Sequence, residues 1–257
     1  MKKGMFLLML LSSSMAMAQS LLTFNTHAPR GGDIIHKQQV PYIETGATGK
    51  DIIWDFSKME ILQESVLQEY LCDTNHIITC VEPSALYQYQ LKEDSLLQTG
   101  YETPIVTMKY SQPILRMEYP FDYGYTAEKK YKGIGLYSNN NAIEEEGTVR
   151  LEADAIGSII LSEKDTLRNV LRMHILKTSS VGMAKDSLLN DSIHRHMEIE
   201  DICQWYARGY RYPIFETRST SYYHNLDVQS NLQTAYRYMP EEQYSLCFSF
   251  WICSRIV

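Results

Sequence analysis

Positive charge is scarce in this sequence, and it is not clustered. The 257-residue chain has 24 Lys+Arg against 31 Asp+Glu, a formal net charge of −7, and no run of more than two consecutive Lys or Arg. Binding to nucleic acid depends on clustered Lys and Arg that neutralise phosphates. The composition therefore argues against nucleic acid as a partner.

The chain also lacks an apolar run of the roughly 20 residues that a membrane span requires. A shorter apolar run, Met5 to Leu11, follows Lys2 and Lys3 and precedes Ala16-Met17-Ala18. This order is typical of a secretory signal peptide, and no Cys follows the small-residue site as it would in a bacterial lipoprotein. We expect residues 1–18 to be a signal peptide. Residues 19–257 are then exported to the periplasm, cell surface or extracellular space, without a transmembrane span.

Cysteine is rare and odd in number: Cys72, Cys80, Cys203, Cys247 and Cys253. Export permits disulfides, but an odd count leaves at least one thiol unpaired or paired between chains. Cys72 and Cys80 flank a turn at 73–75, so a bridge across neighbouring strands is one interpretation. Burial of both as small apolar side chains is the favoured one.

Motifs for nucleophilic or phosphate chemistry are missing. The chain has no Gly-x-Ser-x-Gly elbow and no Cys in the context of a thiol protease. Gly133-Ile134-Gly135 is too short for a phosphate loop. Glu144-Glu145-Glu146 has the residue type of a glycosidase pair but lies in a polar run that we expect to be a solvated loop. The sequence favours a non-catalytic protein without a cofactor.

Apolar and polar residues alternate through much of the chain, as in strands with one buried face. Val149, Leu151, Ala153 and Ala155 interleave with polar residues over 148–155. Similar alternation covers 87–91 and 115–121, and further candidate strands are 77–81, 96–101, 158–161, 170–177, 197–206 and 213–218. This spacing indicates an antiparallel sandwich or barrel. We expect a mainly β fold of sandwich type, as one domain or as two β halves divided near 139–146.

Helical patterns are few. Ser57 and Glu60 have the form of a capping box, and apolar residues follow at helical spacing. Residues 61–71 fit a strand equally well, and we expect a strand there. The tail, 244–257, carries one charge and gathers two Cys and Trp251. It fits a final core strand, with a frame error or premature end in the source sequence as the alternative.

One line of side chains has the composition of a metal site. On a strand, His194, His196, Glu198 and Glu200 point to one face. Imidazole and carboxylate ligands suit zinc, iron or manganese, and His-x-His-x-x-x-Glu is the core of the cupin metal motif. The glycines that flank this motif in cupins are replaced by Leu188 and Ala207. A solvated polar face is therefore the favoured interpretation, and a metal site formed by His194, His196 and Glu200 is the alternative.

Tyrosine is unusually frequent, with 19 Tyr against 7 Phe and 3 Trp. Exposed aromatic faces stack on sugar rings, so a glycan-binding surface is one hypothesis, and Trp205, Tyr206, Tyr210 and Tyr212 are its candidate residues. Tyrosine also suits half-buried strands, where the ring packs and the hydroxyl reaches water. The packing role is the favoured one.

Three segments stand out when they are taken together: Trp54-Asp55-Phe56-Ser57, the run 152–161 leading to Asn169-Val170-Leu171-Arg172, and the run 205–213 from Trp205 to Pro213. In this order they resemble a β-rich domain of uncharacterised secreted proteins of Bacteroidota. The resemblance covers about residues 33–216, and its motifs are structural. It implies an extracellular or envelope location and a β fold. Within the second segment, we expect Gly157 to permit a tight turn between two strands.

The same resemblance implies O-glycosylation, since exporters of this group attach glycans at Asp-Ser or Asp-Thr followed by a small or aliphatic residue. The matching acceptors are Ser95, Thr166, Ser187 and Ser192. Asp-Ser and Asp-Thr also favour turns ahead of strands, which is the other interpretation.

The sequence therefore predicts an exported, non-catalytic envelope or extracellular β protein. The alternatives are a module that binds a glycan or an envelope protein and a metal-dependent, cupin-like enzyme.

Overall fold

The computed structural model describes residues 22–162, 165–184, 196–224 and 227–239. These residues are almost entirely β, with one four-residue helix, α1 (Phe24–His27). None of the described helices has the length and apolarity for crossing a bilayer. The strands are β1 (Ile34–Val40), β2 (Gly49–Asp55), β3 (Gln63–Cys72), β4 (Ile77–Glu82), β5 (Ala85–Lys92), β6 (Ser95–Glu102), β7 (Val106–Glu118), β8 (Thr126–Tyr137), β9 (Asn141–Ser162), β10 (Asp165–Met183), β11 (His196–Tyr206), β12 (Phe215–His224) and β13 (Asp227–Tyr238).

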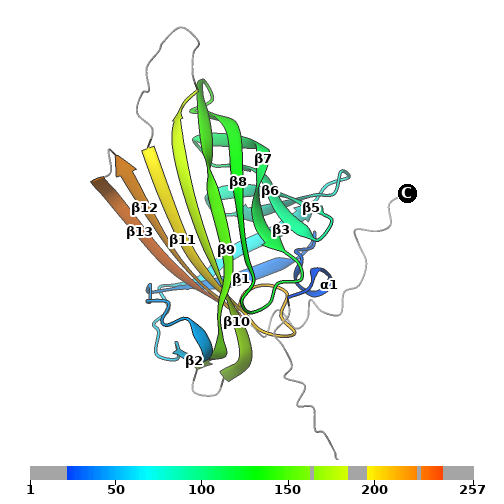
Figure 1. The fold of residues 1–257 in the computed structure, drawn as a ribbon, viewed down its shortest axis with the longest axis vertical. Helices are drawn as coiled ribbons and strands as arrows, with labels where there is room; N and C mark the ends of the chain where they lie inside the picture. The colour runs from blue at the N-terminus through cyan, green and yellow to red at the C-terminus, as the bar shows by residue number, and fades with distance from the viewer. Residues whose placement is uncertain (1–21, 163–164, 185–195, 225–226, 240–257) are drawn as a thin grey trace, which may run out of the picture.

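Twelve of these strands close into an antiparallel barrel (Figure 1). Leaving β2 aside, each wall strand pairs with the next along the chain, and β9 pairs with β10 over most of its length. The last strand, β13, returns to the first, with Lys37 of β1 opposite Tyr238. The expected sandwich is therefore wrong. Period-two alternation is common to both architectures, and closure depends on pairing between strands far apart in the sequence.

The segment expected to divide two β halves lies within this single wall. Residues 138–140 form the turn between β8 and β9, and 141–146 begin β9. Ser138 and Asn139 have positive φ angles of 49° and 64°, as tight hairpin turns require. The strand expected over 61–71 is confirmed as β3.

The barrel contains an apolar core at one end and a second apolar core lies outside it. Val149, Leu151 and Ala153 of β9 belong to the inner core, whereas Ala155 belongs to the outer one. A register shift opposite Arg172 and Met173 leaves Asp154 as an extra residue in β9. After this bulge, the side chains of β9 that would have pointed into the barrel point outwards. The four apolar residues expected on one face therefore divide between two cores.

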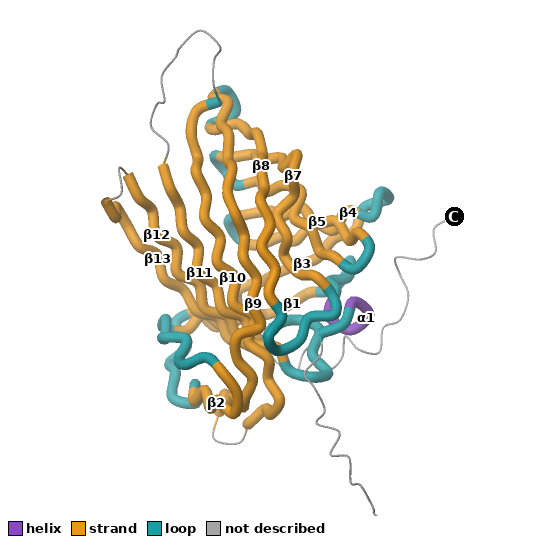
Figure 2. Tube along the Cα trace, viewed as in Figure 1, coloured by secondary structure: helices purple, strands orange, loops and turns teal. Residues whose placement is uncertain are grey.

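The outer core is covered by the segment between β1 and β3. Figure 2 shows this segment, with β2, beside the lower ends of the long strands. Its Trp54 and Phe56 pack edge-to-face against Trp205 at centroid distances of 5.9 and 5.5 Å. β2 runs parallel to the end of β9, beyond the residues of β9 that pair with β8. It therefore covers a strand edge that would otherwise be exposed.

Gly157 lies at the contact between β2 and β9. The expectation of a tight turn at this residue is wrong. The residue lies inside β9, opposite Ile52 of β2 and Val170 of β10. A Cβ atom at this position would lie 1.9 Å from the Ile52 carbonyl oxygen. Glycine is needed here because the backbone of β2 approaches so closely.

Cys72 and Cys80 are not linked to each other. In the β3–β4 register, Cys72 lies opposite Ile78 and Cys80 lies opposite Tyr70. Cys80 is 1% exposed, and burial raises the pKa of its thiol to about 12. This cysteine therefore behaves as a small buried side chain, as favoured from the sequence.

Candidate functional site: a tyrosine-lined cavity in the barrel

The barrel encloses a cavity of about 510 Å³ above its apolar core. This volume lies within the range of sites for small molecules, which is about 300–1,000 Å³. Among the described residues, ten tyrosines and no Phe or Trp line the cavity, so more than half of the chain's 19 Tyr gather here. They are Tyr70, Tyr87, Tyr89, Tyr101, Tyr110, Tyr119, Tyr206, Tyr212, Tyr222 and Tyr238.

The tyrosine hydroxyls fall into two groups. Five bind other side chains: for example, Tyr110 donates to Glu145 at 3.0 Å and Tyr212 to Asp33 at 2.8 Å. The other five have no hydrogen-bond partner among the described residues: Tyr87, Tyr89, Tyr101, Tyr119 and Tyr222. Burial raises the pKa of each of these five, so the hydroxyls stay neutral. They can donate and accept hydrogen bonds with a ligand.

A buried lysine holds three carboxylates on one side of the cavity. The Lys177 ammonium lies 2.6 Å from Glu200, 3.2 Å from Glu145 and 3.9 Å from Glu198. Burial alone would lower the pKa of Lys177, but the Glu200 and Glu145 charges outweigh burial and raise it above its ordinary value. The lysine is therefore charged and anchors the network.

The remaining buried charges extend this network around the wall. Arg218 of β12 lies 3.7 Å from Glu216 and 3.9 Å from Glu200. Lys37 of β1 donates to Glu82 of β4 at 2.9 Å. The cavity thus has a polar, charged interior whose carboxylates each face a cation of the protein.

Glu198 is the carboxylate of the network whose pKa is raised, whereas the pKa of Glu200 is lowered. Burial raises the pKa of Glu198 to about 7, with nearby Glu200 adding to this and Lys177 opposing it. Folding therefore favours protonated Glu198. The stabilising effect is present below the ordinary pKa of 4.5 and is lost as the pH rises through about 7.

Replacing Glu198 with Gln removes this titration. At pH 8 we expect Glu198→Gln to stabilise the fold by about 1–2 kcal/mol, since the neutral amide avoids the buried charge. At pH 5 the variant and the parent protein should differ little in stability. Urea unfolding at both pH values measures the effect, with exposed Glu128→Gln as the control. Parallel pH profiles for the Glu198→Gln and parent proteins would contradict this account.

Arg116 is a cavity cation outside these ion pairs, although its charge lowers the pKa of Glu82 and Glu200. In β6–β7 pairing, Leu96 lies opposite Met117 and Leu97 opposite Leu115, so Arg116 is the extra residue of a β-bulge. Bulges often turn a side chain towards a site. Arg116 lines the cavity and makes no hydrogen bond or ion pair with the described residues. Burial raises the pKa of Tyr89, and the Arg116 charge opposes this.

The aromatic residues proposed as a glycan-binding surface are buried. Trp205, Tyr206, Tyr210 and Tyr212 are between 0% and 7% exposed. Trp205 and Tyr210 belong to the outer core, whereas Tyr206 and Tyr212 line the cavity. The four side chains therefore do not form one exposed surface, and two of them contribute to the candidate site.

The residues predicted as metal ligands do not lie together in one site among the described residues. His194 lies outside the described residues, and His196 is exposed, with its ring 5.1 Å from that of His224. Glu198 and Glu200 both line the cavity, as the shared strand face predicted. The Glu200 carboxylate binds Lys177 and lies close to Arg218, so it is an ion-pair partner in this structure.

The candidate glycosylation sites are only partly described. Ser95 begins β6 and is half-buried, whereas Thr166, near the start of β10, is exposed. Ser187, Ser192 and the apolar tail, 244–257, lie outside the described residues. Thr166 is the more accessible of the two described acceptors.

Sequence reasoning missed Arg116, Glu145 and Lys177. Glu145 was expected in a solvated loop but is a strand residue that is 2% exposed. The alternation of Val149 and Leu151, extended back along the chain, places Glu145 on the buried face and was a signal for it. The sequence carried no such signal for Arg116, because the direction of its side chain depends on a β-bulge.

Comparison with protein families, curated proteins and solved structures finds no match to this chain.

Proposed function

We propose that the protein is an exported, non-catalytic binding protein that holds a small acidic sugar inside its barrel. The observation that carries this proposal is the Arg116 guanidinium, which makes no hydrogen bond or close ion pair among the described residues, in a cavity that ten described tyrosines line. A guanidinium fork matches a carboxylate in charge and geometry. The ligand therefore carries an anionic group that Arg116 binds.

The rest of the cavity favours a ligand rich in hydroxyl groups. Of the described residues, ten tyrosines but no Phe or Trp line it, and five of these tyrosines have hydroxyls without a partner in the described part of the chain. Gln68 and Gln98 add amide groups to the wall. Tyrosine rings also stack on the apolar faces of sugars. A sugar with a carboxylate satisfies all three features, whereas an apolar acid would leave the hydroxyls unpaired.

The proposal also states that the protein is exported and that it does not catalyse a reaction. The signal-peptide pattern of residues 1–18 and the resemblance to secreted proteins of Bacteroidota support a periplasmic, surface or extracellular location. The described cavity carboxylates lie near Lys177, Arg218 or Lys37, and these charges lower the pKa of Glu82 and Glu200. We assign these groups to the structure of the wall, with no catalytic role.

Calorimetry with defined sugars tests the proposal. We expect glucuronate, galacturonate or N-acetylneuraminate to bind, and glucose and galactose to bind at least 10-fold more weakly. Arg116→Gln should weaken binding of the acid at least 10-fold, about 1.4 kcal/mol. Arg150→Gln, on the outer face of β9 and paired with Glu152, is the control and should bind normally.

Two outcomes would contradict the proposal. If no acidic sugar binds, or if Arg116→Gln binds it as tightly as the parent does, the cavity is not the proposed site. If benzoate binds as tightly as the acidic sugars, the ligand class is wrong, although the role of Arg116 stands.

A further inference from the structure

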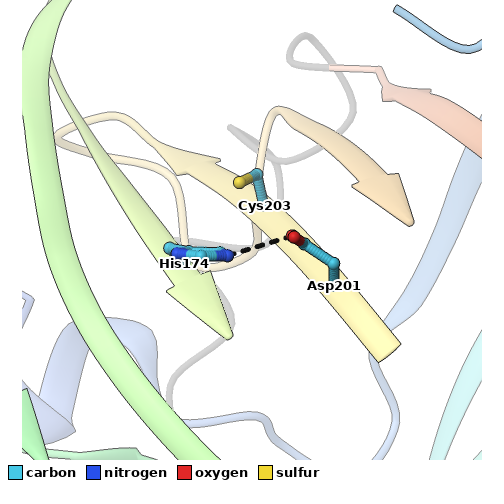
Figure 3. Close-up of side chains that lie close together, drawn as sticks. All are labelled: His174, Asp201 and Cys203. Carbon is cyan, nitrogen blue, oxygen red and sulfur yellow. Dashed lines mark hydrogen bonds and ion pairs between the residues drawn. The ribbon is translucent and has the colours of Figure 1, made fainter. Parts of the chain in front are cut away.

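Three potential metal ligands converge on the outer wall of the barrel, separate from the cavity. His174 lies on β10, and Asp201 and Cys203 lie on β11 (Figure 3). His174 pairs with Cys203 in the register, and Asp201 is two residues away on the same face of β11. Glu200 and Gln204, which alternate with them, line the cavity. The three side chains therefore share the opposite face of this wall.

The donor atoms are close to the spacing of a zinc site. One nitrogen, one oxygen and one sulfur atom all lie within 4.8 Å of one another, and His174 Nε2 is 3.0 Å from Asp201 Oδ1. With zinc–ligand bonds of about 2.0–2.3 Å, tetrahedral donors lie about 3.3–3.8 Å apart. Small side-chain rotations therefore suffice to reach this geometry.

The surroundings allow a metal to enter. The Asp201 side chain is 51% exposed and that of His174 is 29% exposed, while Cys203 is 2% exposed. The nearest buried cation on the same strand, Arg172, binds Asp154 through two contacts of 2.8 Å. Its charge is thus balanced within the protein. Cys203 is therefore a buried ligand, and Asp201 and His174 are ligands that solvent can reach.

We propose that His174, Asp201 and Cys203 bind one zinc ion, with a fourth position open to water. Mixed nitrogen, oxygen and sulfur donors select zinc and related transition metals over magnesium or calcium. Binding requires the thiolate of Cys203, and the displaced proton passes to solvent. The ion would join β10 to β11 on the outer wall. This site is independent of the proposed sugar cavity.

Cobalt provides a direct spectroscopic test, because Co²⁺ occupies zinc sites and a thiolate ligand gives it an intense near-ultraviolet charge-transfer band. We expect the reduced full-length protein to bind one Co²⁺ with this band, and Zn²⁺ to displace it. Cys203→Ser should abolish the band. Asp201→Asn should weaken Co²⁺ binding at least 10-fold, and because Asp201 is half-exposed, the variant should fold normally.

Controls separate this site from the other thiols. Cys72→Ser and a Cys247→Ser/Cys253→Ser double variant should keep the band and the 1:1 stoichiometry. The proposal is overturned if the parent protein shows no thiolate band with Co²⁺. It is equally overturned if Cys203→Ser keeps the band, or if folded Asp201→Asn binds Co²⁺ as tightly as the parent.

Discussion

Lys177→Met should lower the stability of the protein by about 3–5 kcal/mol at pH 8. The substitution leaves Glu145, Glu198 and Glu200 in the barrel without the cation that lies within 4 Å of each. Removing one partner from a buried ion pair is costly because the remaining charge is desolvated and uncompensated. For a domain of this size, we expect a fall in Tm on the order of 10 °C.

The pH dependence identifies the cause of this loss. The Lys177 charge lowers the pKa of Glu198 and Glu200, so without it these two carboxylates titrate at higher pH, and protonation at pH 5 should remove part of the penalty. Thermal unfolding at pH 5 and pH 8 measures the difference. Lys132→Met is the matched control, because Lys132 is 42% exposed and its ion pairs lie on the outer face. An equal loss of stability for Lys177→Met at both pH values would show that the charges are not its origin.

Arg172→Met is the second substitution with a large expected effect. Arg172 is 1% exposed, binds Asp154 through two contacts of 2.8 Å and donates to the carbonyl of Thr45. Its guanidinium also lies near the rings of Trp54 and Trp205, 5.8 and 5.9 Å from their centroids. The side chain therefore connects the segment before β2 to the outer wall. We expect a loss of about 3–5 kcal/mol.

A double variant separates charge from packing. In Arg172→Met the Asp154 carboxylate is left buried and unpaired, whereas Arg172→Met/Asp154→Leu removes both charges. We expect the double variant to recover at least 1 kcal/mol relative to the single variant. Urea unfolding followed by tryptophan fluorescence measures both, since Trp54 and Trp205 report on this contact. No recovery would indicate that packing, and not the buried charge, dominates.

The sequence predicted the strands of this fold better than their arrangement. The alternation over 148–155 correctly indicates a strand, because side chains on a strand point to alternate faces wherever the strand lies. It does not show the bulge at Asp154, which sends Ala153 and Ala155 to different cores. Nor does it show closure, since the β1–β13 pairing joins opposite ends of the described chain.

The candidate site was predictable only in part. The shared face of Glu198 and Glu200 follows from strand periodicity, and both residues line the cavity. The excess of tyrosine pointed to either packing or binding, and the structure gathers ten of these rings around one cavity. Which cation meets each carboxylate depends on strand order, and Lys177 and Arg218 reach Glu200 from the strands on either side of β11.

Nuclear magnetic resonance of methyl-labelled methionine tests most directly whether a ligand enters the barrel. Met117 lines the cavity, whereas Met59 packs against the outer core. On saturation with the tightest-binding acidic sugar, we predict that the Met117 methyl signal shifts and the Met59 signal stays in place. In Arg116→Gln, the same sugar concentration should shift the Met117 signal less than in the parent protein and leave the Met59 signal in place. A shift at Met59 with Met117 unchanged would contradict binding inside the barrel.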